Sequence, residues 1–311
     1  MQGKIAIHDA DNTLFPNLAL MKISAYYKSK GNKVDWFSPL EAKKYLAVFS
    51  SSVFTFKKGK FSNYLPEHTV YGGTGYNKFC RLPEEAEKFK PDYEIYGIDY
   101  SLGFITRGCP NKCFWCIVPE KEGGVKPNAE AKEIIVHDKA VLLDNNILAS
   151  QFGIEQLEEI SKMEVKIDLC QGIDSRYMDK EIAHLFSKIK WLKPVRLACD
   201  NQAQKKPLEK AVHNLREADV TPKRYSCYVL LKNSIDDAYD RVMFAHSLGV
   251  NPFVMPYRDF NSKNEVPYEH RKFARWVNHK AVFKSTDWEN YRLNYPRKRQ
   301  RGNNAGFFHN I

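Results

Sequence analysis

From Leu102 onward, short apolar runs alternate with segments that have the hydrophobic period of a helix. The apolar runs are Leu102 to Thr106, Val141 to Leu143, Val165 to Leu169, Val195 to Ala198, Tyr225 to Leu231 and Pro252 to Met255. The helical segments are 154–163, 182–189, 208–218 and 235–248. Strands that alternate with helices are typical of parallel sheets with helical crossovers. About six strands are too few for a closed eight-stranded barrel, so the pattern predicts a partial (β/α)6 barrel.

The first hundred residues show a smaller version of the same alternation. Strands are expected at 4–7, 33–37 and 46–56, a helix at 17–30, and a glycine turn at Gly72-Gly73-Thr74-Gly75. This pattern predicts a Rossmann-like, doubly wound sheet. We therefore expect an α/β protein with three parts. They are a front domain at 1–98, the partial barrel at 99–262, and a helical extension with a basic tail at 263–311.

Composition narrows the class of protein. Hydrophobic residues make up 43% of 311 residues, which is enough for a substantial core. No apolar run approaches the roughly 18 residues that cross a bilayer, and acids occupy the start where a signal peptide is apolar. The seven cysteines are an odd number with one tight cluster, which favours a reducing compartment. We expect a cytoplasmic protein without a membrane partner, whose net charge of +11 favours polyanions.

The cysteine cluster is the most informative motif. Cys109, Cys113 and Cys116 lie within eight residues after a predicted strand, in a loop that contains Gly108 and Pro110. Three thiolates bind three irons of a cubane [4Fe–4S] cluster and leave the fourth iron open. A structural zinc site would need a fourth Cys or His nearby. The sequence offers no such residue shortly after the loop, so it predicts an iron–sulfur cluster.

The Cys-x3-Cys-x2-Cys spacing, with an aromatic residue before the last Cys, resembles the signature of radical S-adenosylmethionine (SAM) enzymes. The resemblance implies that Cys109, Cys113 and Cys116 hold the cluster and that its open iron binds SAM. It also implies that reductive cleavage of SAM gives a 5′-deoxyadenosyl radical. Trp115 is then expected beside the adenine. The family also implies an external electron donor such as flavodoxin or ferredoxin.

Polar residues after the next strands are the further cofactor candidates that the resemblance implies. Asp144 and Asn145 end the second barrel strand, where the family places groups that hold the amino end of SAM. The residues suited to its ribose and carboxylate are Gln171, Asp174, Arg176, Asp200 and Asn201. Asp and Asn are also the usual residues of turns and helix caps, so a structural role is the alternative for each.

The front domain resembles the cobalamin-binding-type domain of one radical SAM branch. More narrowly, Phe15–Ser24 and Leu142–Ala149 resemble a poorly characterised branch found in gut bacteria and phages. The Asp-x-His-x-x-Gly pattern that supplies an imidazole to cobalt in many such domains is absent, which makes cobalamin an optional ligand. The segment from Asp9 through Asp11 also resembles the first motif of haloacid-dehalogenase-type phosphatases. The acidic pair that those enzymes need downstream is missing from the front domain.

These observations predict a radical SAM enzyme whose substrate is a small molecule, a nucleotide or a nucleic acid. A nucleic-acid-binding protein with a structural metal clip is the first alternative, and the phosphatase is the second. Near the C-terminus, Arg271, Arg275 and Lys280 surround Trp276 on a predicted helix at 268–284. We expect packed aromatics under a solvated basic face there, with phosphate binding or base stacking as the alternative.

Overall fold

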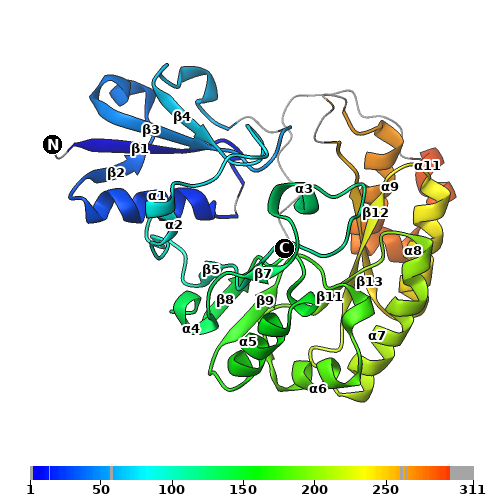
Figure 1. The fold of residues 1–311 in the computed structure, drawn as a ribbon. Coiled ribbons are helices and arrows are strands. Elements are labelled where there is room, and N and C mark those ends of the chain that lie inside the picture. Colours follow the sequence, from blue (N-terminus) through cyan, green and yellow to red (C-terminus); the bar gives the residue numbers. More distant parts are fainter. Residues whose placement is uncertain (1–2, 14, 57–58, 260–261, 263–264, 295–311) are drawn as a thin grey trace. The chain divides into compact units, whose positions relative to one another are not determined.

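The computed structural model describes residues 3–13, 15–56, 59–259, 262 and 265–294 (Figure 1). The chain divides into two compact units, of which the first ends at Leu102 and the second begins at Gly103. This division lies close to the boundary at 98 that the sequence suggests. Both units combine helices with parallel strands, so the α/β class is confirmed.

The described residues of the first unit form four strands and two α-helices. They are β1 (Lys4–Asp9), α1 (Leu18–Ser29), β2 (Lys33–Trp36), β3 (Tyr45–Ser51), β4 (Thr69–Gly72) and α2 (Glu84–Glu87). The strands form one parallel sheet in the order β2-β1-β3-β4. Because β1 lies between β2 and β3, the chain moves to opposite sides of β1 in successive crossovers. Ligands of doubly wound sheets bind at such a switch point, beyond the carboxyl ends of the strands.

Alternating residues of β1 supply the two cores of the first unit. Ile5 and Ile7 pack with Leu20 of α1, whereas Ala6 packs with Val48 on the other face. Helix α1 lies against the sheet (Figure 1). It begins because the side chain of Asn17 caps its first turn by accepting from the Leu20 N–H at 3.3 Å.

The second unit repeats the strand and helix alternation. Its first elements are β5 (Ser101–Gly103, which starts in the first unit), β6 (Thr106–Arg107), α3 (Val118–Glu122), β7 (Lys126–Pro127), α4 (Ala131–Ile134), β8 (Lys139–Leu142), α5 (Gln151–Ser161) and β9 (Lys166–Leu169). The later ones are α6 (Lys180–Lys188), β10 (Lys190–Trp191), β11 (Arg196–Ala198), α7 (Lys205–Glu217), β12 (Ser226–Leu231), α8 (Ile235–Ser247) and β13 (Asn251–Pro256). Three further helices follow, namely α9 (Tyr268–Asn278), α10 (Lys280–Ser285) and α11 (Trp288–Asn294).

The strands of the second unit pair as two main sheets. One has the order β10-β9-β8-β5 and the other β11-β12-β13, while β6 and β7 form a short antiparallel ribbon. Among the described residues, an isolated parallel bridge joins Ile173, in the segment after β9, to Leu197 of β11. A buried ion pair between Asp168 and Arg196 spans the same division. The continuous six-stranded partial barrel therefore stays a prediction at this level of detail.

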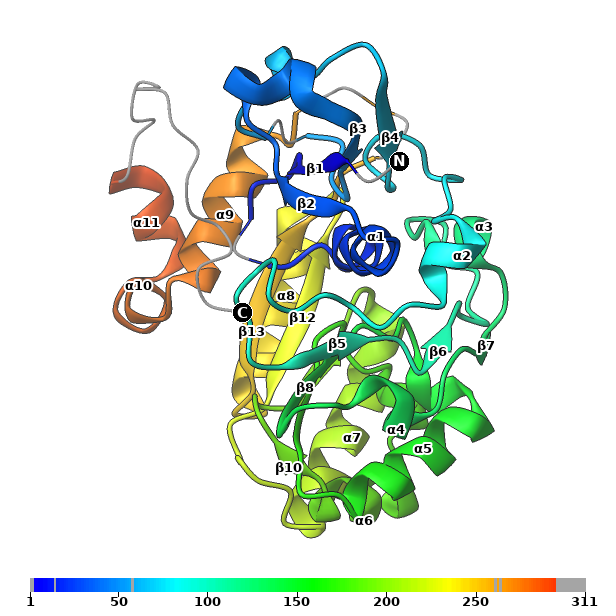
Figure 2. The ribbon, with the colours of Figure 1, turned by 90° about the vertical axis from the view of Figure 1, so that its left-hand side faces the viewer.

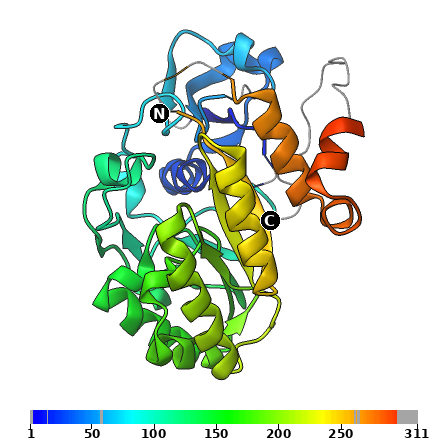
Figure 3. The same ribbon diagram turned by 90° about the vertical axis from the view of Figure 1, so that its right-hand side faces the viewer.

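Helices cover the second unit from one side of its sheets. Figure 3 shows α8 lying along β12 and β13, and α9 packs against β13 as well. The caps are local in sequence, since the side chains of Ser150, Asp179 and Ser234 accept from backbone N–H groups in the first turns of α5, α6 and α8. One large core includes Leu142, Phe186, Val229 and the helix residues facing them.

The C-terminal helices enclose an aromatic cluster. Figure 2 shows α9, α10 and α11 lying together, and the rings of Phe273, Trp276, Trp288 and Tyr291 meet between them. The packed aromatics predicted for this segment are confirmed, because Trp276, Trp288 and Tyr291 are buried. The single helix predicted at 268–284 is wrong. The chain breaks at His279, whose side chain accepts from the Val282 N–H and starts α10.

Two further sequence expectations concern membrane-spanning helices and the basic tail. Among the described residues, no helix combines the length and apolar character needed to cross a membrane. The basic tail at 296–301 lies outside the described residues.

Candidate functional site

The cysteine loop leaves β6 and returns through α3. Its backbone is held by two hydrogen bonds. The Cys109 N–H donates to the Gly123 carbonyl at 3.1 Å, and the Cys116 N–H donates to the Cys113 carbonyl at 2.9 Å. Gly108 has a φ of +84°, and a Cβ there would lie 2.3 Å from the Gly124 carbonyl oxygen. Only glycine allows the chain to enter the loop this closely.

Glu122 closes the base of the loop. Its carboxylate accepts from Arg107 Nε at 3.0 Å and Nη2 at 2.6 Å, from the Gly108 N–H at 3.0 Å, and from Asn145 Nδ2 at 3.0 Å. The side chain is 7% exposed, so these donors compensate for its loss of solvation. Sequence reasoning missed Glu122, because nothing in the segment distinguishes it from the exposed acids around it.

The three thiols of the loop are free and lie close enough to affect one another's ionisation. Burial raises the pKa of Cys113 and of Cys116, and the neighbouring thiols add to this effect. Asn146 Nδ2 lies 3.5 Å from the sulfur of Cys109. Among the described residues, no three His, Cys, Asp or Glu side chains are arranged as metal ligands. The loop supplies a donor set of the iron–sulfur type, and the cluster itself stays a prediction.

Trp115 and Phe114 extend from the same loop. Their rings meet edge to face with centroids 4.6 Å apart, and Phe114 is 75% exposed. Lys232, which follows β12, places its Nζ 3.6 Å from the centre of the Phe114 ring. The predicted contact of Trp115 with an adenine stays a prediction.

The end of β8 is tied to the start of the cysteine loop. Asp144 is buried and accepts from the Ile105 N–H at 3.2 Å, from the Thr106 N–H, and from the Thr106 hydroxyl at 2.7 Å. Burial raises the pKa of this carboxyl. Asn145 contacts Glu122, as described above. Both predicted cofactor residues thus position the loop through protein contacts, and their role toward a ligand stays a prediction.

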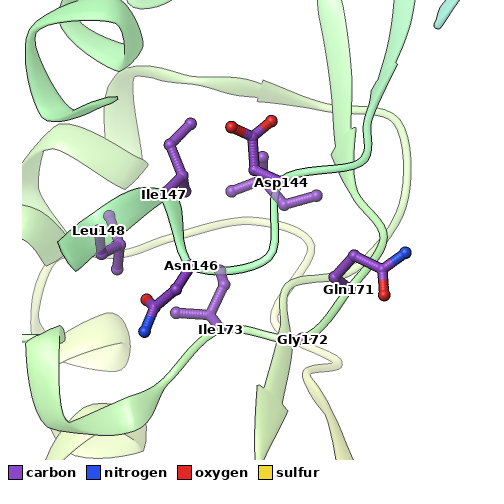
Figure 4. Close-up of a pocket in the computed structure, with 8 residues that line it drawn as sticks. Asp144, Asn146, Ile147, Leu148, Gln171, Gly172 and Ile173 are labelled. Atoms are coloured by element: carbon purple, nitrogen blue, oxygen red, sulfur yellow. The ribbon is translucent and has the colours of Figure 1, made fainter. Parts of the chain in front are cut away.

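A small cavity lies between the ends of β8 and β9. It is lined by Asp144, Asn146, Ile147, Leu148, Leu169, Gln171, Gly172 and Ile173. Figure 4 shows that the amide groups of Asn146 and Gln171 point in opposite directions. These two amides therefore do not converge on one point of the cavity.

The segment after β9 contacts the cysteine loop through Asp174. Its Oδ2 accepts from Asn111 Nδ2 at 2.9 Å, and its carboxylate also accepts from Arg176 Nε at 2.8 Å and Nη2 at 2.6 Å. Burial opposes ionisation of Asp174, but the hydrogen bonds from Arg176 and Asn111 outweigh it and lower the pKa. Asn111 is a second residue that sequence reasoning missed.

Asp200 and Asn201 follow β11. Asp200 accepts from the Leu230 N–H at 3.3 Å, and burial raises the pKa of its carboxyl to about 6. Its charge also raises the pKa of Cys113 and Cys116, so it lies within electrostatic range of the loop. Within the described part of the chain, Oδ1 of Asn201 is the buried side-chain atom that has no hydrogen-bond partner. An acceptor in this state is suited to a ligand hydroxyl.

Comparison with solved structures finds similarity over most of the chain. The structure of TsrM from Kitasatospora setae, a radical SAM methyltransferase with tryptophan and a SAM analogue bound, matches 82% of this chain and 73% of its own. The TM-score is 0.57 and the sequence identity is 12%. The fold is similar to that of a radical SAM enzyme.

A weaker similarity is found to SuiB from Streptococcus suis bound to SAM. The TM-score is 0.41 at 13% identity, over 61% of this chain and 46% of that one. No protein-family model matches the sequence, and no curated protein matches it either.

The two acids of the phosphatase-like motif, Asp9 and Asp11, have hydrogen-bond partners within the first unit. Asp9 accepts from the Tyr96 hydroxyl at 2.8 Å and from the Asp11 N–H at 3.0 Å. Asp11 accepts from the Ser52 hydroxyl at 2.9 Å and from the Val53 N–H at 2.6 Å. These contacts favour a role in shaping the turn after β1 over the nucleophile and acid pair of a phosphatase.

Proposed function

We propose that the protein is a radical SAM enzyme that reductively cleaves SAM at a [4Fe–4S] cluster bound by Cys109, Cys113 and Cys116. One observation carries the proposal. Three free cysteines occupy a single loop in a chain whose fold is similar to that of a radical SAM methyltransferase. A cluster with three protein ligands would supply an open iron for SAM and an electron that releases a 5′-deoxyadenosyl radical.

The residues around the loop divide into two groups in this proposal. Glu122, Asn146 and Asn111 hold the loop and its sulfurs by the contacts described above. The candidates for holding SAM are Trp115, Asp144, Asn145, Gln171, Asp174, Arg176, Asp200 and Asn201. Among them, Asn201 has an unsatisfied buried oxygen for a ribose hydroxyl, and Arg176 is a cation for the SAM carboxylate.

The remaining task of the protein is to position the substrate and to exclude water. A radical reacts with any nearby C–H bond, so placement contributes more than acid–base chemistry. An external electron donor such as flavodoxin or ferredoxin is part of the proposal. Cobalamin in the first unit stays a prediction of the resemblance.

The test is anaerobic reconstitution with iron and sulfide, followed by reduction with dithionite in the presence of SAM. We expect about four irons per chain, a broad visible absorption that dithionite bleaches, and release of 5′-deoxyadenosine. Cys113→Ala should lose all three. Cys80→Ala, which removes a free thiol of the first unit, is the matched control and should keep them.

Two results would reject the proposal. Stoichiometric zinc with no iron uptake would indicate the structural clip of a nucleic-acid-binding protein. Magnesium-dependent phosphoester hydrolysis that is lost in Asp9→Asn and kept in Cys113→Ala would indicate the phosphatase.

A further inference from the structure

Six aromatic rings are exposed on β4 and on the segments that follow β3 and β4 in the first unit. They belong to Phe56, Phe61, Tyr64, Tyr71, Tyr76 and Phe79, which together we call the aromatic surface. Their exposure runs from 38% for Phe61 to 66% for Tyr64. Exposed rings in this number mark a binding surface, because folding leaves their apolar area in water.

The rings are arranged in contact with one another and with lysines. The centroids of Tyr71 and Tyr76 lie 5.0 Å apart, and those of Phe61 and Tyr64 lie 6.4 Å apart. Lys60 Nζ lies 5.0 Å from the Phe61 centroid, and Lys78 Nζ lies 5.1 Å from that of Phe79. Cations therefore accompany the rings at two separate points of the surface.

A buried polar network fixes the two segments to each other. His8 Nε2 lies 2.8 Å from the Lys60 carbonyl, which can only accept, so Nε2 donates. Since burial lowers the pKa of His8, the neutral ring accepts at Nδ1 from the Ser50 hydroxyl at 2.8 Å. Ser50 in turn accepts from the Tyr76 hydroxyl at 2.9 Å. The segment at Lys60 and the ring of Tyr76 are thus held before any ligand arrives, which lowers the entropy cost of binding.

The turn after β4 depends on a close backbone approach. The Gly75 N–H donates to the Ser52 carbonyl at 2.8 Å, and a Cβ on Gly75 would lie 2.7 Å from the Phe54 carbonyl oxygen. Glycine therefore brings the chain that carries Tyr76 and Phe79 onto the segment that follows β3. Both segments lie beyond the carboxyl ends of parallel strands, where ligands of such sheets bind.

The charge of these segments is positive. Glu67 is the only acid in the sequence from 53 to 81, whereas Lys60, Lys78 and Arg81 are the bases of its described part. A second copy of the chain is disfavoured as the occupant, because two such surfaces would repel each other. A partner with planar apolar groups and regular negative charges satisfies both the rings and the lysines.

We propose that the aromatic surface binds single-stranded nucleic acid, with unpaired bases stacked on the rings and backbone phosphates near the lysines. Unpaired bases present the faces that rings stack on, whereas a duplex keeps those faces inside its own stack. Several rings spread over two segments match a run of nucleotides better than one nucleotide. The proposal is independent of the chemistry proposed for the cysteine loop.

The experiment measures binding of the full-length chain to fluorescent oligo-dT and oligo-U of about 15 nucleotides by anisotropy. A duplex of the same length and the mononucleotide dTMP are compared at the same salt. We expect tighter binding of the single strands than of the duplex. Tyr64→Ala and Phe79→Ala should each weaken single-strand binding by about 5- to 100-fold. The oligo-dT and oligo-U arms show whether DNA, RNA or both are bound.

Salt dependence separates the roles of the lysines and the rings. Lys60→Gln should reduce the slope of log affinity against log salt by about 0.7, the contribution of one phosphate contact on a single strand. Lys44→Gln and Leu40→Ala are the matched controls. Their side chains are exposed before β3, at the opposite end of that strand, and binding should be unchanged.

The proposal is overturned if single strands do not bind, if the duplex binds equally well, or if the ring variants bind as the wild type does. Capture of anionic vesicles that is lost in the ring variants, without oligonucleotide binding, would assign the surface to membranes instead. Cys113→Ala should bind oligonucleotides normally. Tyr64→Ala and Phe79→Ala should still release 5′-deoxyadenosine, so failure of one proposal leaves the other testable.

Discussion

Arg107 and Glu122 form a bidentate ion pair across the base of the cysteine loop. Arg107 Nε and Nη2 donate to the two carboxylate oxygens at 3.0 and 2.6 Å. The same carboxylate accepts from Gly108 and Asn145. One side chain therefore joins the strand that enters the loop, the loop itself and the end of β8. Substitution of Glu122 tests whether this junction stabilises the loop.

Glu122→Ala should lower the free energy of unfolding by about 3 kcal/mol, because Arg107 loses its partner in a partly buried site. It should also lower the iron retained after reconstitution, since the loop loses its anchor. Glu122→Gln keeps an acceptor oxygen and should lose less. Urea denaturation and iron analysis are the measurements. Glu158→Gln, an exposed acid of α5, is the control, and equal losses in Glu158→Gln would refute the role of Glu122.

Asp200 predicts a dependence of stability on pH in the metal-free protein. Its pKa is raised from 3.8 to about 6, so the folded state favours the protonated form. The stabilisation from this group is complete below the unfolded pKa and is lost as the pH rises through the folded one. The loss amounts to ~3 kcal/mol between about pH 4 and pH 7.

Asp200→Asn should remove this dependence. The free energy of unfolding of the variant minus that of the wild type should be larger at about pH 6.5 than at about pH 4.5, as measured by urea denaturation. Glu209→Gln, an exposed acid of α7, should show the same difference from the wild type at both values. A wild-type curve parallel to that of Asp200→Asn would show that the carboxyl is not desolvated.

The ion pair between Asp168 and Arg196 should be costly to break singly. Both side chains are less than a tenth exposed, and Arg196 Nη2 donates to Asp168 Oδ2 at 3.1 Å. Asp168→Asn should lower the free energy of unfolding by about 3 to 5 kcal/mol, because the guanidinium is left buried without a countercharge. Replacing the pair by Leu and Met should restore most of this stability. A double variant as unstable as Asp168→Asn would contradict the explanation.

Trp276 tests the interpretation of the C-terminal helices. The ring is 2% exposed, and its Nε1 donates to the Thr286 carbonyl at 2.8 Å. Trp276→Ala should cost about 3 to 5 kcal/mol of stability in thermal or urea unfolding. Arg275→Ala, on the exposed face of the same helix, should change stability by less than about 0.5 kcal/mol. Equal effects would mean that the aromatic cluster is not a core.

The order of strands and helices follows from the sequence because their periods are local properties. The strand predicted at 225–231 is β12, and the helix predicted at 235–248 is α8, which ends at Ser247. The break at His279 was missed because a histidine cap has no strong pattern. The pairing of the strands into two main sheets cannot be read from their periods, because strand pairing depends on distant segments.

The shared loop of the three cysteines was predictable, and the contacts around it were less so. Spacing alone placed Cys109, Cys113 and Cys116 on one loop. Asp144 was predicted to face a ligand, but Thr106, distant in sequence, occupies much of its carboxylate. Glu122 and Asn111 gain their roles from contacts with residues on other elements, and such tertiary contacts leave no trace in a single sequence.

The isolated bridge between Ile173 and Leu197 has a consequence for the motions of the second unit. In the described part of this unit, the two main sheets are not joined by a continuous ladder of backbone hydrogen bonds. Separating them therefore requires mainly that packed side chains move apart. Amide protons along this seam are therefore expected to exchange with deuterated solvent sooner than those inside either sheet. We therefore expect the second unit to open along this division before either sheet separates.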